Sequence, residues 1–111
     1  MKLTEIVEKL HLTCFTDENI PDKEITTCYT GDLLSDVMGA LNENEIWITL
    51  QTHKNVAAIA SLKDAAAILL VKGLQPDADM LFHAGEEGVP VLGTDQDAFV
   101  ISGRIYQLLN R

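Results

Sequence analysis

Short apolar runs alternate with segments of helical periodicity along this chain, and no other feature of the sequence constrains the fold as much. The clearest run is Ala66–Val71, which reads Ala-Ala-Ile-Leu-Leu-Val without a polar interruption. A strand that is covered on both faces of a sheet has this pattern. Helical segments precede and follow the run, so we expect parallel strands joined by crossover helices. The predicted fold class is α/β, a three-layer α/β/α arrangement around a largely parallel sheet of four to five strands.

Local signals place the other elements. Thr4 is a candidate cap for an amphipathic helix over 4–10, and Asn55 and Thr94 stand at cap positions of two later helices. A further helix opens at Gly31-Asp32, where Asp32 could also serve as a cap. Strands are expected at 11–15, 25–29, 46–51, 66–71 and 89–92.

Proline and glycine punctuate the second half of the chain. Pro76 suits the first turn of a helix that Gly88 is placed to end. Pro90 indicates that its strand either lies at the sheet edge or begins with the proline. The helices should turn these apolar side chains inward: Leu33, Leu34, Val37, Met38 and Leu41; Val56, Ile59, Ala60 and Leu62; Ala98, Ile101, Ile105 and Leu108.

The charge balance limits the partners of the chain. It holds 17 Asp and Glu against 8 Lys and Arg, a net charge of −9, so we expect neither nucleic-acid binding nor attachment to anionic membranes. The N-terminal segment lacks the apolar region of a signal peptide, and no run approaches the ~20 residues of a membrane span. Cys14 and Cys28 form no redox or zinc motif. We therefore expect a cytoplasmic protein of one domain over 1–111, in which 1–24 form an N-terminal helix, strand and acidic loop.

Four loops should meet at one edge of the predicted sheet. In an open parallel sheet, ligands bind at the carboxyl ends of the strands, where helix N-termini point amide groups outward. A pocket for a small anionic ligand is one interpretation, and the alternative is that the same residues are helix caps and turn formers. The candidate ligand-binding residues on this predicted rim are Gly31, Asp32, Thr52, His53, Lys54, Asn55, Lys72, Gly73 and Thr94.

The sequence offers little for catalysis. No zinc-binding spacing, serine-nucleophile elbow or phosphate-binding glycine loop is present, so we expect no metal and no cofactor. An enzyme would need His53 as general base, oriented by Asp32 or Asp95, and this is the least favoured reading. His11 and His83 are predicted to be interior or half-exposed.

Apolar and small residues outside the core favour self-association. Gly39, Gly85 and Gly103 lie inside helical segments, where each costs about 1 kcal/mol relative to alanine. Close helix packing explains them, and so does close approach of a second subunit. Met38, Trp47, Phe82 and Phe99 are the exposed apolar residues that a homodimer would cover.

Several segments together resemble the DRTGG domain family, and beyond it the N-terminal domain of HPr kinase/phosphorylase. The resemblance covers roughly 25–111 and is strongest at Ala67–Pro76, Met80–Thr94 and Asp97–Ile105. Where many family members carry Gly-Asp-Arg, this chain has Gln51–Lys54, and Val71–Gly73 stands in place of Thr-Gly-Gly.

The resemblance implies a non-catalytic regulatory or assembly module that is a homodimer and binds a protein partner. The alternative is a small-molecule sensor, with a nucleotide-like anionic ligand held at the strand-end loops.

Overall fold

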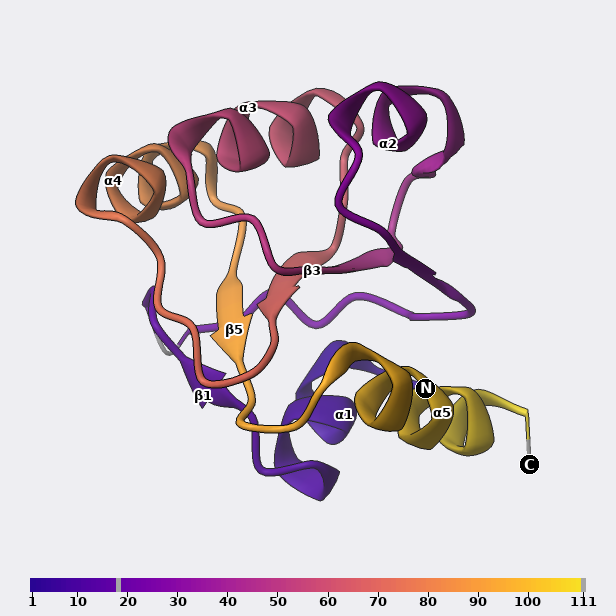
Figure 1. Cartoon of the computed structure of the whole chain (residues 1–111). Helices are drawn as coiled ribbons and strands as arrows, with labels where there is room; N and C mark the ends of the chain where they lie inside the picture. Colours follow the sequence, from indigo (N-terminus) through magenta and orange to yellow (C-terminus); the bar gives the residue numbers. More distant parts are fainter. Residues whose placement is uncertain (18, 111) are drawn as a thin grey trace.

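Strands and helices alternate along the chain in the computed structural model, which describes residues 1–17 and 19–110 (Figure 1). The ten elements are α1 (Leu3–Lys9), β1 (Thr13–Cys14), β2 (Cys28–Thr30), α2 (Leu34–Ala40), β3 (Ile46–Thr49), α3 (Lys54–Leu62), β4 (Ala67–Leu70), α4 (Ala78–Glu87), β5 (Val91–Gly93) and α5 (Ala98–Leu109).

The five strands form one sheet in the order β1-β5-β4-β3-β2. Strands β2 to β5 are mutually parallel, and β1 pairs antiparallel with β5. Each of the three crossovers from β2 to β5 therefore leads to the neighbouring strand. The predicted α/β class with a largely parallel sheet is confirmed.

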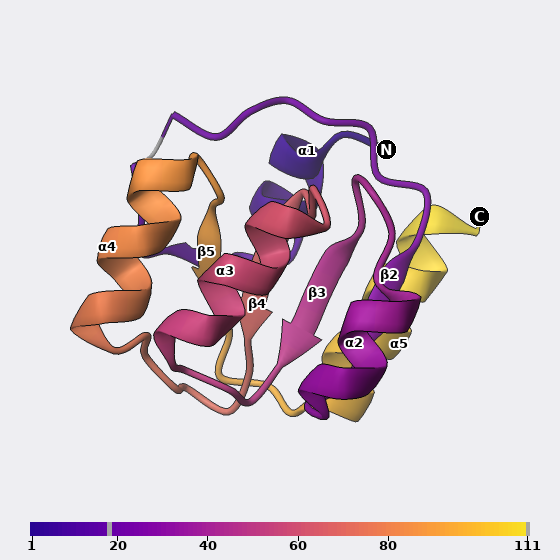
Figure 2. The same ribbon diagram turned by 90° about the horizontal axis from the view of Figure 1, so that it is seen from above.

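Helices cover both faces of the sheet. Helices α2, α3 and α4 lie side by side on one face, and α1 and α5 lie on the other (Figures 1 and 2). Because side chains alternate along a strand, Ile46 and Ile48 of β3 enter the core under α1 and α5, whereas Trp47 enters the core under α2 to α4. All four residues of β4 are buried, as the apolar run predicted. The three-layer arrangement is thereby confirmed.

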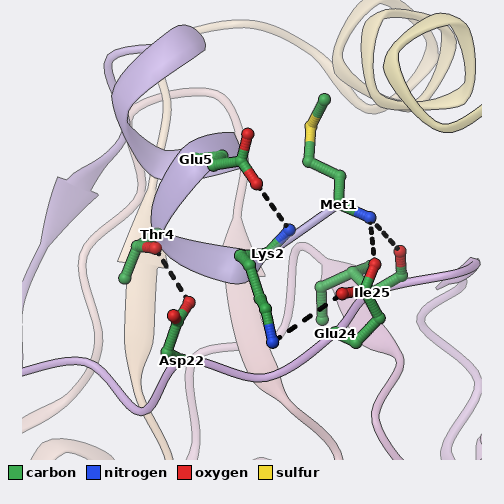
Figure 3. Close-up of polar contacts among 7 residues, drawn as sticks. All are labelled: Met1, Lys2, Thr4, Glu5, Asp22, Glu24 and Ile25. Carbon is green, nitrogen blue, oxygen red and sulfur yellow. Dashed lines mark hydrogen bonds and ion pairs between the residues drawn. The ribbon is translucent and has the colours of Figure 1, made fainter.

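Contacts to the segment before β2 fix the start of α1 (Figure 3). The amide of Leu3 donates to the carbonyl of Lys23 at 2.9 Å, and the Thr4 hydroxyl donates to Asp22 Oδ1 at 2.9 Å. Thr4 lies inside the first turn of α1, so its prediction as the cap is wrong. Its hydroxyl instead joins the helix to the segment 22–25, whose Glu24 also pairs with Lys2.

The other predicted caps are wrong as well. Helix α3 begins at Lys54 after His53, so Asn55 is already helical. The cap of α5 is Asp97, whose carboxylate accepts a hydrogen bond from the Val100 amide at 2.9 Å. Thr94 does not cap that helix, because α5 begins only at Ala98 and the Thr94 hydroxyl accepts from the Gln96 amide, which lies before the helix, at 3.3 Å. Asp32 likewise lies outside α2, which begins after Leu33.

Two helix faces are narrower than predicted. Helix α2 begins at Leu34, so Leu33 lies outside it and is 68% exposed. Met38, inside the same helix, is 40% exposed. Leu62, the last residue of α3, is 67% exposed. The predicted stripe of α5 is confirmed, since Ile101 and Ile105 are both buried.

The proline predictions also need correction. Helix α4 begins at Ala78 after Asp77, so Pro76 precedes the helix rather than occupying its first turn. Pro90 lies just before β5, and β5 is an interior strand because β1 pairs with its outer side. Gly88 ends α4 in the left-handed region, at φ 71°, as predicted. Within the described part of the chain, no helix has the length and apolar character needed to span a bilayer.

Candidate functional site

The carboxyl ends of β2, β3, β4 and β5 meet at one edge of the sheet, as the parallel order requires. The loops that follow them form the predicted rim, which runs along this edge (Figure 2). The rim is not one continuous site. Its hydrogen bonds divide it into three local arrangements.

Asp32 binds the end of the neighbouring strand. Its Oδ1 accepts hydrogen bonds from the Thr49 hydroxyl at 2.8 Å and from the Leu50 amide at 2.7 Å. The Gln51 side chain donates to the Asp32 carbonyl at 3.1 Å, and the Gly31 carbonyl accepts from Trp47 Nε1 at 2.8 Å. These bonds join the β2–α2 loop to the end of β3. Asp32 therefore has a structural partner that explains its presence on the rim.

His53 pairs with a carboxylate of the next loop. Its Nδ1 lies 3.2 Å from Asp77 Oδ2, and both side chains are more than half exposed. The Asp77 amide also donates to the Thr52 carbonyl at 3.0 Å. The partner expected for a catalytic His53 was Asp32 or Asp95, and this pairing is wrong. Lys54 and Asn55 are exposed in the first turn of α3.

The loop after β4 reverses in a tight turn. Lys72 and Gly73 have φ of 60° and 70°, and the Leu74 amide donates to the Val71 carbonyl at 3.1 Å. Two consecutive left-handed residues are typical of a type I′ turn, for which glycine is favoured. The amides of Lys72 and Gly73 donate to the carbonyls of Gln96 and Thr94, both at 2.9 Å. The turn after β4 is thus fixed to the loop after β5.

A cavity of about 400 Å³ opens at this junction. Adjacent parallel strands whose following helices go to opposite faces leave a crevice between their loops. Here α4 returns to one face of the sheet and α5 to the other (Figure 1). The lining comes from four parts of the chain: Leu10, His11, Thr13 and Phe15; Gly73, Leu74 and Gln75; Gly93, Thr94, Asp95 and Gln96; and Arg104.

Of the predicted site residues, only Gly73 and Thr94 line this cavity, and Lys72 belongs to the same turn. The other six, which lie outside it, are Gly31, Asp32, Thr52, His53, Lys54 and Asn55.

Sequence reasoning missed two basic side chains of the cavity, His11 and Arg104. His11 was predicted to be interior or half-exposed, but it is exposed and left-handed, at φ 53°. His83 is also exposed. Arg104 comes from the middle of α5, and no local signal marks it. The described residues include no group of three or more His, Cys, Asp and Glu that could hold a metal ion.

A second surface lies on α5 beside β2. Phe99 is 87% exposed and Tyr106 is 68% exposed. The predicted exposure of Met38, Phe82 and Phe99 is confirmed. The predicted exposure of Trp47 is wrong, because its side chain is fully buried. Next to Phe99 is a mostly apolar hollow of about 430 Å³, lined by Thr30, Ala98, Phe99, Ser102, Gly103 and Tyr106.

Two ionisable groups of β2 have raised pKa values. The Tyr29 hydroxyl donates to the Asp36 carboxylate, which raises the pKa of Tyr29 to about 12. Burial of the Cys28 thiol raises its pKa to about 12, and the nearby Glu45 contributes in the same direction. Both groups are therefore neutral at physiological pH.

A family model and a solved structure both match this chain along most of its length. The family model for the DRTGG domain matches residues 5–108, including the N-terminal segment that the sequence analysis left outside the resemblance. A search of the curated proteins finds no match.

One solved structure is described as the CBS and DRTGG domains of the regulatory region of Clostridium perfringens pyrophosphatase, complexed with the activator diadenosine tetraphosphate. It superposes with a TM-score of 0.70 at 17% identity. The superposition covers 95% of this chain and 46% of that one, so this chain spans about half the length of that relative.

Proposed function

Because the chain belongs to the DRTGG domain family, we propose that it is a non-catalytic regulatory or assembly module that forms a homodimer and binds a protein partner. The regulatory region of the Clostridium perfringens pyrophosphatase contains a domain of this family, which supports a regulatory role. Cys14 and Cys28 are both free thiols, as expected of a module that works in the cytoplasm.

The exposed apolar surface of α5 carries the homodimer proposal. Phe99 projects from the surface beside a hollow of about 430 Å³, and Phe99 itself lines that hollow together with Gly103 and Tyr106. A Cβ added at Gly103 would have no neighbour within 4 Å, so a second chain can approach the helix backbone closely there. A projecting ring next to a hollow on the same helix is self-complementary under a two-fold axis.

The free edge of β2 extends this surface. Strand β2 ends the sheet, and no strand pairs with its outer side in residues 1–17 and 19–110. Thr30 of β2 lines the same hollow, and its hydroxyl lies 2.8 Å from that of Ser102. The lining contains no Asp or Glu, so the net charge of −9 places no repulsion at the centre of the contact. A second copy is therefore the occupant that we propose.

Sedimentation velocity tests this proposal. We expect a species of twice the 12.2 kDa chain mass at concentrations on the order of 10 μM. Phe99→Glu should give a monomer, because it introduces a charge at the centre of the contact. Phe82→Glu is the matched control, since Phe82 is 64% exposed but lies on α4, across the sheet, and should leave the dimer intact. A monomeric wild-type chain would refute the homodimer.

The cavity between the loops of β4 and β5 favours a second candidate function, the sensing of a small anionic ligand. The regulatory region of the structural neighbour is complexed with diadenosine tetraphosphate, which is a ligand of this class. Thermal unfolding with nucleotides and sugar phosphates tests the candidate. A specific ligand at 100 times its dissociation constant should add about 2.7 kcal/mol to the free energy of unfolding. No stabilisation by any of them would count against sensing while leaving the dimer untouched.

A further inference from the structure

Arg104 stands where two cavities adjoin. One is the cavity of about 400 Å³ between the loops of β4 and β5. The other, of about 610 Å³, shares Leu10 and Arg104 with it and continues between the end of α1 and the last turns of α5. Lys9 lines the second cavity, and His11 lines the first.

Taken together, the two cavities are net positive, because Lys9 and Arg104 line them against the single carboxylate of Asp95, whereas the chain as a whole is acidic. The sequence has 17 acidic residues against 8 Lys and Arg, yet a single carboxylate, that of Asp95, lines either cavity. Among the residues described, the ion pairs involve only the Met1 ammonium, Lys2, Glu24, His53 and Asp77. Lys9 and Arg104 are thus unpaired in a strongly acidic protein. Lys9 in the last turn of α1 can be explained by the helix dipole, but Arg104 in the middle of α5 cannot.

The wall of the first cavity also contains an unsatisfied polar atom. Oε1 of Gln96 is buried and has no hydrogen-bond partner among the described residues. A buried acceptor without a partner costs about 1–3 kcal/mol, and such an atom in a native fold calls for an explanation. Gln96 lines the cavity, so a rotation of its amide would bring it to a hydrogen-bonding group of a ligand. The ligand therefore needs both an anionic group and a polar organic part.

We infer that the two adjoining cavities bind an organic phosphate. Its phosphate group lies on Arg104, between Lys9 and His11, and its organic part lies in the cavity that Gln96 lines. A guanidinium offers paired donors that match phosphate oxygens. The first cavity has a volume of about 400 Å³, which lies within the roughly 300–1,000 Å³ typical of small-molecule sites. This volume is larger than a free inorganic ion requires. Leu10, Phe15 and Leu74 supply apolar walls. This inference rests on the second candidate function.

Amide chemical shifts of the isotope-labelled full chain test the assignment. AMP, added up to about 5 mM, should shift the amides of His11, Gly73 and Arg104. Inorganic phosphate should shift the amide of Arg104 at higher concentration and leave Gly73 unmoved. Arg104→Ala should weaken AMP binding at least about tenfold, and Arg104→Lys should recover part of it. Lys63→Ala, a cation at the end of α3, is the matched control and should change binding less than about twofold.

Three results would overturn the assignment. Equal affinity for AMP and inorganic phosphate would show that the site does not recognise the organic part of the ligand. Unchanged AMP binding by a folded Arg104→Ala variant would show that Arg104 does not bind the phosphate. Shifts confined to the loops of His53 and Asp77 would place the ligand elsewhere on the rim. In that last case small-anion sensing would survive, whereas the absence of any shift would count against both. The melting temperature of each variant reports whether it folds.

Discussion

Replacing Asp32 separates a structural role from a ligand-binding role on the rim. In the structure its Oδ1 accepts from the Thr49 hydroxyl at 2.8 Å and from the Leu50 amide at 2.7 Å. Thr49 is 2% exposed, so water cannot replace the carboxylate there, whereas the exposed Leu50 amide can bond to water. Asp32→Ala therefore removes one hydrogen bond that cannot be replaced and one that can.

The magnitude follows from these two bonds. A hydrogen bond to a charged acceptor contributes about 1.5–3 kcal/mol to the free energy of unfolding. The bond from the Leu50 amide, which water can replace, contributes at or below the low end of this range. We expect Asp32→Ala to lower the free energy of unfolding by about 2–4 kcal/mol. Asp32→Asn keeps a neutral acceptor and should cost about 1 kcal/mol. In a chain of 111 residues, each kcal/mol lowers the melting temperature by about 4 °C. The melting temperature of Asp32→Ala should therefore be about 8–16 °C lower than that of the wild type.

Urea unfolding followed by circular dichroism measures the effect as a lower midpoint at constant slope. Asp95→Ala is the control, because Asp95 is an exposed rim carboxylate for which the structure gives no hydrogen bond, and it should stay within about 0.5 kcal/mol of wild type. In a double-mutant cycle with Thr49→Val, the coupling should be about 1–2 kcal/mol. If Asp32→Ala is as stable as Asp95→Ala, the hydrogen bonds at the end of β3 do not hold the loop.

Three other measurements follow from the packing and ionisation of named groups. Gly93→Ala places a Cβ 2.5 Å from the Phe15 ring and should destabilise the fold by about 1–3 kcal/mol, with Phe15→Leu restoring part of the loss; no loss of melting temperature would contradict the packing. Gly39→Ala meets nothing within 4 Å in α2 and should stabilise the protein by about 0.5–1 kcal/mol in the same melting assay. The raised pKa values of Cys28 and Tyr29 mean that the unfolded chain loses these protons first, so the stability that these two groups contribute should be constant below about pH 9 and be lost as the pH rises towards 12; Cys28→Ala with Tyr29→Phe should flatten that loss in urea titrations.

The sequence was sufficient for the fold because burial on two faces leaves a readable pattern. The uninterrupted run of β4 requires covering layers above and below, and the helical segments on either side of it supply them. The same logic, applied to β3, would have placed Trp47 in the core. It was predicted to be exposed, with Met38, Phe82 and Phe99, as an apolar residue that a homodimer would cover. Only the second helical layer reveals that β3 has no outward face.

The site was less predictable because a short polar side chain after a strand has two uses. Asp32 could cap its own helix or bind a neighbouring strand, and the local sequence supports both. The choice depends on Thr49, a residue of a different strand, whose hydroxyl is brought beside Asp32 by the sheet register. The cavity has the same origin, since His11 and Arg104 are far apart in the chain. Their proximity depends on where α1 and α5 pack.

The direction of α5 accounts for both proposed surfaces. The three crossover helices α2, α3 and α4 lie on one face of the sheet, and α5, which follows the last strand, lies on the other (Figure 1). At the start of α5 the loops after β4 and β5 are hydrogen-bonded to each other, and the cavity lies between these loops, the segment 10–15 and Arg104. The helix then lies beneath β2 and β3, against the free edge of the sheet, where Thr30 meets Ser102 (Figure 2). One helix therefore contributes to both surfaces, because Arg104 lines the two cavities that it shares with Leu10, whereas Phe99 and Tyr106 are exposed beside the apolar hollow. Substitutions at Arg104 and Phe99 can thus test the two proposals separately within a single element.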